Sequence, residues 1–332
     1  MSQSQQYTKV QYGGETTYGT ETSSYNELFL VQSCNLTSNN NLIQSRGLGE
    51  GFNVKKALYG IFSASGDITQ DLYDFTFLRH WIGALSGAGT LGDKYTLTEA
   101  TRVNPSSSAT YLQPFSIEKL NDTETSTNAV EVGLGCVGTD FSMTTSIGQP
   151  LNFNGNFIVR ETKYRSTGET FTDAQQTAYV MQGGSWKYGS TPSTLSGVQS
   201  VTINYQNGLI VDRRSIESRL IKMPLFGERV YGISVSIEMA TSLATTIIND
   251  FYGSVSSGVY SPVDDGTAGP TESLEFKIEL VNGSKYANIW FDDFVIENIG
   301  ISDSQNGGLR VLTFEGFAYE GKSNTPFTWW SV

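Results

Sequence analysis

The chain has 332 residues and one histidine, His80. Catalysis or metal binding that needs an imidazole would therefore have to use His80. It stands directly before Trp81 in an apolar stretch, and the corresponding position in the second half of the chain lies near Asp250, which offers no imidazole. A serine–histidine–aspartate site would need His80, and the chain contains no Gly-x-Ser-x-Gly motif. We therefore predict that the protein is not an enzyme, with no catalytic residue.

A glycine-rich stretch, Gly133-Leu-Gly-Cys-Val-Gly138, formally matches the fingerprint of dinucleotide-binding proteins. That fingerprint needs a helix N-terminus directly after it to hold the pyrophosphate, whereas Thr139-Asp-Phe-Ser-Met-Thr-Thr145 has the character of a strand. We interpret the stretch as a strand with glycine bulges and predict no cofactor.

Two acidic pairs, Asp264-Asp265 and Asp292-Asp293, have oxygen ligands that a cation would accept. Neither pair has the alternate-residue spacing of a calcium-binding loop. We expect a solvated turn or a surface face at each pair, and we predict no metal site.

The overall composition favours a β-rich scaffold. Only 16% of the residues are charged, glycine occurs 35 times, and aromatic residues make up 12%. The net charge of −12 and the pI of about 4.6 argue against a basic face that reads DNA and against attachment to an anionic membrane. We see no secretory signal and no apolar run long enough to span a membrane, so we expect no membrane insertion and synthesis in a host cytoplasm.

An internal repeat is the main organising feature. Residues 31–46 and 198–213 agree at seven of sixteen positions, at an offset of 167 residues. Residues 116–121 resemble 277–282, and 151–155 resemble 312–316, both at an offset of 161. A repeat in the same order predicts one module built twice. Cys34 and Cys136 correspond to Val201 and a position near Phe294, so we expect buried free thiols.

Each module is predicted to contain about six strands and one helix. We expect a strand pair at 28–43 and 198–211, folded at an Asn-rich turn. Alternating apolar residues predict strands at 59–68, 233–239, 274–281, 287–299 and 309–319. Helical spacing predicts amphipathic helices at 71–85 and 242–255. The domains would be an N-terminal arm (1–30), module 1 (31–162), an insertion or linker (163–197), module 2 (198–322) and a C-terminal tail (323–332).

The order of these elements resembles that of the tail tube proteins of tailed viruses. The likeness is strongest from Asn128 to Phe157, where a strand, a glycine-marked turn and an L-x-F-x-G strand follow one another. Glu15-Thr-Thr-Tyr-Gly-Thr20 also looks like the start of such chains. The resemblance implies a mainly β fold with one helix per module, as two tandem tail-tube-like β-sandwich or barrel modules.

The resemblance also implies a function. Such subunits form stacked rings around a channel for viral DNA, and a duplicated module would make a trimeric ring with pseudo-six-fold symmetry. The chain would belong to the virion tail. Its partners would be its own copies and other tail proteins (terminator, tape measure, distal tail), with DNA passing through without sequence-specific binding. Strand acids such as Glu131, Glu275 and Glu279 are candidates to face the channel, and Trp329-Trp330 in the tail is a candidate contact between rings.

Three alternatives remain open. The chain could be a distal tail or baseplate ring, or the inner tube of a contractile system. It could also be a carbohydrate-binding β-protein in which Tyr179, Trp186 and Tyr188 form a sugar platform, although no export signal is visible. An enzyme would need a constellation of polar residues that we do not find.

Overall fold

The computed structural model describes residues 8–45, 56–88, 90, 95–105, 111–121, 130–168, 176–189, 193–216, 218–239, 242–252, 255–256, 259–260, 274–282, 285–303, 310–318 and 327–331. Within these ranges nearly every element is an antiparallel strand, with one α-helix and one short 3-10 helix. The prediction of a mainly β fold is confirmed.

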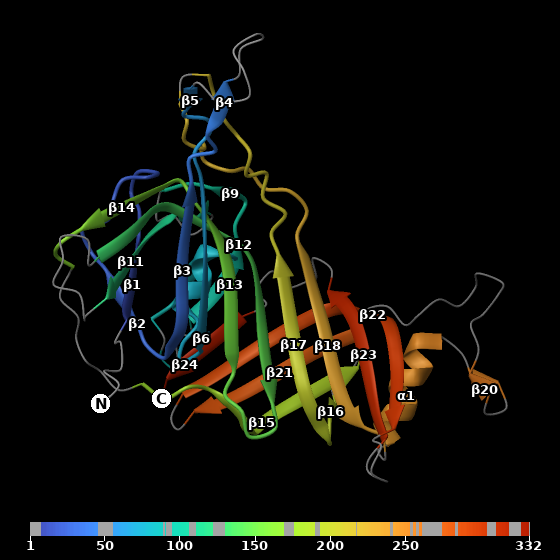
Figure 1. Ribbon diagram of the computed structural model, residues 1–332. Coiled ribbons are helices and arrows are strands. Elements are labelled where there is room, and N and C mark those ends of the chain that lie inside the picture. The colour runs from blue at the N-terminus through green and yellow to red at the C-terminus, as the bar shows by residue number, and fades with distance from the viewer. Residues whose placement is uncertain are drawn as a thin grey trace, which may run out of the picture.

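Eight antiparallel strands form one layer, the front sheet (Figure 1). Their hydrogen-bonded order is β3 (Val31–Asn39), β6 (Ser63–Asp71), β13 (Asn152–Val159), β12 (Val130–Ser146), β17 (Val198–Gln206), β18 (Val230–Glu238), β23 (Arg310–Ala318) and β22 (Lys285–Asp303). The first four strands and the last four pair in the same relative order along the chain. In each group the first strand pairs with the second, the second with the fourth, and the fourth with the third.

Two groups of strands behind the front sheet form the back layer (Figure 1). One consists of β2 (Asn26–Leu28), β1 (Thr8–Gly14), β11 (Phe115–Asn121), the first half of β12, and β14 (Glu161–Arg165). The other consists of β16 (Ser193–Thr194), β15 (Val180–Gly189), β21 (Leu274–Asn282), the first half of β22, β24 (Phe327–Ser331), β8 (Tyr95–Glu99) and β7 (Gly83–Ser86). The long strands β12 and β22 therefore belong to both layers.

The remaining elements are short. They are the strand pairs β4 (Ile43–Ser45) with β5 (Lys56–Leu58), β9 (Arg102–Val103) with β10 (Tyr111–Leu112), and β19 (Val255–Ser256) with β20 (Val259–Tyr260), and the helices η1 (Thr76–His80) and α1 (Ser242–Tyr252).

Trp81 is the central side chain of the core between the layers in the first half of the molecule. It is fully buried, and its Nε1–H donates to the carbonyl oxygens of Asp140 (3.0 Å) and Asn156 (2.9 Å). The indole lies against the backbone of Gly138, where an added Cβ would come within 2.4 Å of it. The missing side chain at Gly138 thus lets Trp81 bond to two front-sheet strands at once.

One of the two predicted helices is present. Helix α1 covers most of the predicted 242–255, with Ile247 buried against the core. The helix predicted at 71–85 is wrong, because only Thr76–His80 form a 3-10 turn and Gly83 begins β7. Leu72 has a different backbone pairing: its N–H donates to Leu151 O, and its carbonyl accepts from Tyr179 N, both at 2.8 Å. The Leu72 carbonyl, which a helix would bond to an N–H four residues further along, therefore accepts from Tyr179 instead.

The predicted hairpins at the Asn-rich turns are wrong in their pairing. Strand β3 ends at Asn39 and Asn41 has a positive φ of 44°, yet the partner of β3 is β6. Likewise Gly208 has a φ of 56° after β17, whose partners are β12 and β18. After Asn41 the chain enters β4, which pairs with β5 instead of β3. After Gly208 a long segment precedes β18, which begins only at Val230. The strands predicted at 274–281, 287–299 and 309–319 are confirmed as β21, β22 and β23.

Strands also occur in three segments that the sequence assigned to terminal or linking roles. Strand β1 lies within 1–30 and pairs with β11, and β15 lies within 163–197 and pairs with β21. Strand β24 lies within 323–332 and its backbone pairs with β22 and β8. These segments contribute to the sheets, and the division into modules stays a prediction.

Candidate functional surface

The outer side of the front sheet is the candidate functional surface. Successive side chains of a strand point to opposite faces, so each strand gives one row to the core and one to solvent. On β18, for example, Ile233, Val235 and Ile237 are buried, while Ser234 and Ser236 lie on the other side. We call this outer side the polar face. Most of its residues are polar: Ser33, Asn35, Thr37, Asn39, Ser63, Ser65, Asp67, Thr69, Asp71, Asn152, Asn154, Asn156, Asp140, Ser142, Thr144, Ser146, Ser200, Thr202, Asn204, Gln206, Ser234, Ser236, Glu238, Thr313, Glu315, Asn298 and Ser302. Gly232 and Gly300 and the apolar residues Ile158, Val230, Val311 and Phe317 lie in the same rows.

The carboxylates of the polar face accept hydrogen bonds from neutral side chains on neighbouring strands. Asp67 accepts from Asn35 Nδ2 at 2.9 Å, and Asp140 accepts from Asn156 Nδ2 at 2.6 Å. Asp71 accepts from Asn152 Nδ2 at 3.1 Å. Neutral donors orient a carboxylate without cancelling its charge, so these groups keep their negative potential.

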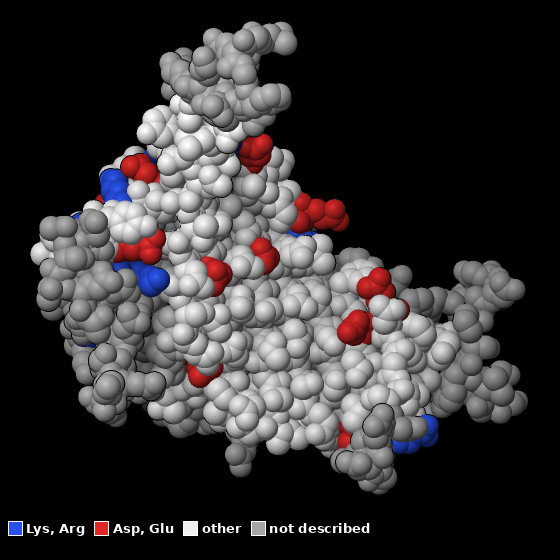
Figure 2. All heavy atoms as spheres, viewed as in Figure 1, with Lys and Arg blue, Asp and Glu red and all other residues white. Residues whose placement is uncertain are grey.

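The charged residues of the polar face are all acidic within the part of the sheet that is described. They are Asp67, Asp71, Asp140, Glu238 and Glu315. Arg310, at the start of β23, is in the core-facing register of its strand. In Figure 2 the surface over the front strands is mostly uncharged with scattered red, and the blue side chains lie towards its margins. A polyanion would meet hydroxyls, amides and negative charge here, and no basic patch.

The three acids named as channel candidates lie elsewhere. Glu131 in the first half of β12 accepts a hydrogen bond from Tyr164 and lies 4.0 Å from the Lys119 ammonium. Glu279 on β21 binds Lys187 at 3.1 Å and Lys277 at 2.9 Å, and its pKa falls to about 2: burial opposes this shift, and hydrogen bonds from Ser185 and the two lysines outweigh it.

Glu275, on the same strand, accepts from Trp290 Nε1 at 3.2 Å. All three acids belong to the back layer and lie outside the polar face, and their place at a channel stays a prediction. The alternation of Ser, Thr and Asn along β3, β13 and β17 was the sequence signal that would have located the polar face.

The proposed sugar platform is contradicted. Tyr179, Trp186 and Tyr188 are 1%, 5% and 1% exposed. The Tyr188 hydroxyl donates to Asp250 at 2.8 Å, which ties β15 to helix α1. Rings that are buried in the core cannot stack on a sugar, so these three serve packing.

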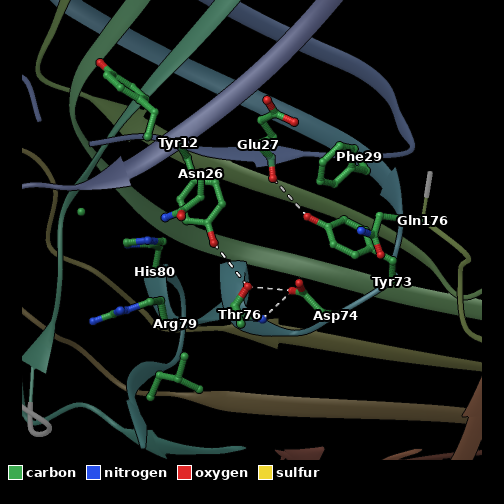
Figure 3. Close-up of a pocket in the computed structure, with 13 residues that line it drawn as sticks. Tyr12, Asn26, Glu27, Phe29, Tyr73, Asp74, Thr76, Arg79, His80 and Gln176 are labelled. Atoms are coloured by element: carbon green, nitrogen blue, oxygen red, sulfur yellow. Dashed lines mark hydrogen bonds between the residues drawn. The ribbon is translucent and has the colours of Figure 1, made fainter. Parts of the chain in front are cut away.

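A hollow beside His80 is a second feature whose residues could suggest chemistry (Figure 3). On one side Tyr12 hydrogen-bonds Thr76 (3.3 Å), and the Thr76 hydroxyl donates to Asp74 (2.7 Å). His80 is outside that chain: it is 1% exposed, and its Nδ1 lies 2.7 Å from the carbonyl oxygen of Gln113. Burial, reinforced by the positive charge of Arg79, lowers the His80 pKa to about 3, so the imidazole is neutral. Its contacts are those of a core side chain.

The glycine stretch lies in a strand and the cysteines are buried free thiols, as predicted. Gly133–Gly138 lies inside β12, with Gly135 at a φ of 62°. Cys34 and Cys136 are free and buried, and burial raises the pKa of Cys34 to about 12.

The remaining candidates are the two acidic pairs. Asp264-Asp265 lies outside the described residues, and Asp292-Asp293 lies in β22 with its side chains outside the description. Over the described residues, no group of three metal-ligating side chains is found. No helix in the same ranges is long and apolar enough to cross a membrane.

Glu15 anchors the segment that follows β1. Its side chain is fully buried and accepts three hydrogen bonds, from Gly19 N (2.6 Å), Ser116 Oγ (2.8 Å) and Gly135 N (2.7 Å). Gly135 has a positive φ, and this glycine conformation aims its N–H at the carboxylate. Burial raises the pKa of Glu15, and these hydrogen bonds oppose the rise. The carboxyl therefore joins residues 15–19 to β11 and β12.

We expect Glu15→Gln to destabilise the unassembled chain by about 1–3 kcal/mol, because the amide NH2 cannot accept the Gly19 N–H. The folded pKa of Glu15 is raised, so its contribution to stability is fully present below the unfolded value of 4.5 and declines as pH rises through the folded pKa. The gap between wild type and variant should thus narrow from pH 4 to pH 7 in denaturant titrations. A gap that widens with pH would contradict this assignment.

Comparison with protein families assigns the chain to a known family. The model of the family described as phage tail tube protein matches residues 6–293, which is most of the chain and includes the front-sheet strands β3, β6, β12, β13, β17 and β18. A search of curated proteins found no match. The chain therefore belongs to the phage tail tube protein family and is a structural component of a virion tail.

Proposed function

We propose that three copies of the chain join their front sheets edge to edge into a closed ring, with the polar face lining a central channel. Stacked rings would form the tube through which the viral genome is delivered. Three chains with eight front strands each would supply twenty-four. At a strand spacing of about 4.8 Å and a tilt of roughly 40°, such a barrel has a backbone diameter on the order of 45–50 Å. Barrels with fewer strands already leave an aqueous channel.

The observation that carries this proposal is the polar face itself. The packing of a single chain does not require a wide sheet face of hydroxyls, amides and carboxylates. A DNA conduit benefits from such a face, because the charged residues among its described positions are acidic and do not attract the phosphate backbone.

An apolar projection at one end of the front sheet is the surface through which we expect neighbouring rings to touch. The loops around β4 and β5 project there (Figure 1). Arg219 ties two parts of the projection together, since its Nε–H donates to Gly60 O at 2.7 Å and its guanidinium donates to Asn40 at 2.9 Å. The exposed apolar side chains are Leu42, Ile43, Leu58, Ile61, Ile210, Ile216 and Leu225. Such a patch is expected to be covered by a neighbouring ring or by another tail protein.

Charge reversal on the polar face tests the conduit. We expect Asp67→Lys with Asp140→Lys and Glu315→Lys to leave tube assembly intact, because these side chains lie on a solvated surface. DNA should then be retained during ejection, and added salt should relieve the retention. The readout is the fraction of genome released from reconstituted particles at low and high salt. Glu161→Lys on β14, in the back layer, is the control. Equal release from all particles would sink the proposal.

A further inference from the structure

We propose that β22 of one chain pairs antiparallel with β3 of the next chain, with Ile301 opposite Leu36. This seam between copies deepens the proposed ring and rests on it. The two strands lie at opposite ends of the front sheet (Figure 1), so one chain cannot join them to each other. The occupant of each edge is a second copy of the same chain.

The template for the seam is inside the molecule. Strand β12, the last of the first four front strands, pairs with β17, the first of the second four. Met143 stands opposite Ile203 on the core side, and both are 1% exposed. On the polar face Thr144 and Thr202 stand opposite each other, with their hydroxyls 3.3 Å apart. A ring built from equivalent groups of four strands would repeat this junction between chains.

Three irregularities in strand pairing fix which residues are equivalent. The register shifts at Gln32 in β3 and at Gln199 in β17, which are 167 residues apart. It shifts at Thr139 in β12 and at Glu297 in β22, which are 158 apart. It also shifts inside β11 and β21, between Phe115 and Ile117 and between Leu274 and Phe276, which are 159 apart.

Each bulge disrupts the hydrogen-bond ladder at one residue. A bulge at corresponding places in two strands therefore shows which residues of the two strands are equivalent. The first spacing equals the repeat offset of 167 that the sequence gives for this region. The other two replace the offset of 161 that sequence letters alone suggested further along the chain.

Applying these spacings to the internal junction gives the register of the seam. Ile301 is the equivalent of Met143, and Leu36 is the equivalent of Ile203. Ile301 and Leu36 therefore stand opposite each other on the core side of the seam. On the polar face, Ser302 is the equivalent of Thr144 and Asn35 is the equivalent of Thr202. The other pairs are Asn298 with Asn39, Ile299 with Ser38, Gly300 with Thr37, and Asp303 with Cys34. In the pairs from Asn298 to Ser302 the polar or apolar character of the template is kept, or the position is filled by a small residue. Asp303 replaces Thr145 at the end of β22, where its neighbour on the other side is Arg310 of β23.

The outer edges of β3 and of β22 between Asn298 and Ser302 lack the features that usually protect a free sheet edge. Ile301 is 49% exposed, whereas its equivalent Met143 is buried at the internal junction. Strand β3 is nine residues long and carries neither a charge nor a proline, the usual protections of a free edge. In the described part of the chain, β3 pairs with β6 alone and residues 298–303 of β22 pair with β23 alone, so each strand has one edge without a partner strand. A partner strand on each would bury Ile301 and satisfy both rows of backbone groups.

Cysteine pairs test the register in assembled full-length protein. Residues directly opposite in an antiparallel pair have Cα atoms about 4.5–5.5 Å apart, within reach of a disulfide. We expect Asn35→Cys with Ser302→Cys to cross-link most chains on mild oxidation, in a ladder that ends at three chains. Asn39→Cys with Ser302→Cys should cross-link at least tenfold less, because Asn39 lies about 13 Å further along β3. Thr144→Cys with Thr202→Cys should form a disulfide within a single chain. This pair is the positive control, because it shows that the oxidation cross-links cysteines that stand opposite each other in an antiparallel strand pair.

Electron microscopy of the same samples separates the two levels of the proposal. Tubes together with cross-linking at 35–302 support the seam. Tubes in which only the 39–302 pair cross-links would overturn the register and leave the ring standing. Samples without rings or tubes, in the untreated wild-type chain as well, would overturn the proposed function and the seam with it. Single-cysteine variants control for the native thiols, which are buried.

Discussion

Replacing Ile301 by aspartate is expected to abolish ring and tube formation while each chain stays folded. The side chain is 49% exposed in the single chain, so an aspartate there remains solvated and should change the free energy of unfolding by about 0.5 kcal/mol or less. In the seam the same carboxylate would be buried opposite Leu36 without a partner, which costs several kcal/mol at every junction. A ring of three such junctions would not close. Sedimentation of the variant should show only single chains.

Two further variants make this result specific. Val230→Asp is a matched control, because Val230 is 44% exposed on the same sheet but lies on the polar face, and it should assemble normally. Adding Leu36→Lys to Ile301→Asp should recover part of the assembly, since the two charges would meet across the seam. Normal assembly of Ile301→Asp alone would contradict the seam.

Trp81→Ala is expected to be the most destabilising single substitution, at about 3–5 kcal/mol. The indole is fully buried, and rings of Phe77, Phe115 and Phe153 lie within 4.8–5.8 Å of it, centroid to centroid. Its removal leaves a large cavity and frees the carbonyls of Asp140 and Asn156 from a donor they share. Such a cost is a large part of the 5–15 kcal/mol typical of a domain. Denaturant unfolding of the unassembled chain measures it.

Trp81→Phe separates the packing of the indole from its hydrogen bonds. It keeps most of the apolar volume and loses the Nε1–H, so about 1–3 kcal/mol should be lost. If both variants unfold within 1 kcal/mol of wild type, Trp81 is not the centre of the core.

Sequence patterns located strands well where one face is buried and the other is wet. Strand β18 shows this, because Ile233, Val235 and Ile237 alternate with small polar residues and the alternation has only one structural meaning. The buried thiols followed from the apolar residues at the corresponding positions of the second repeat, and the strand character of Gly133–Gly138 followed from the residues directly after it.

The errors arose where long-range contacts decide the conformation. Residues 71–85 have helical spacing because the segment is buried on several sides, as Leu72, Leu78 and Trp81 show, and tertiary hydrogen bonds then hold it in other conformations. Tyr188 looked like a surface aromatic because nothing local shows that β15 packs beneath the front sheet. The acids of the polar face were missed because Glu131 and Glu279 also lie on alternating strands, and only the pairing of distant strands separates the two layers.

The number of chains in one ring tests the central claim most directly. Cryo-electron microscopy of tubes assembled from the purified chain should show three chains per ring, a continuous barrel of twenty-four strands, and six similar but unequal wall segments. Six chains per ring, or a wall in which β3 and β22 of neighbouring chains do not meet, would contradict the account.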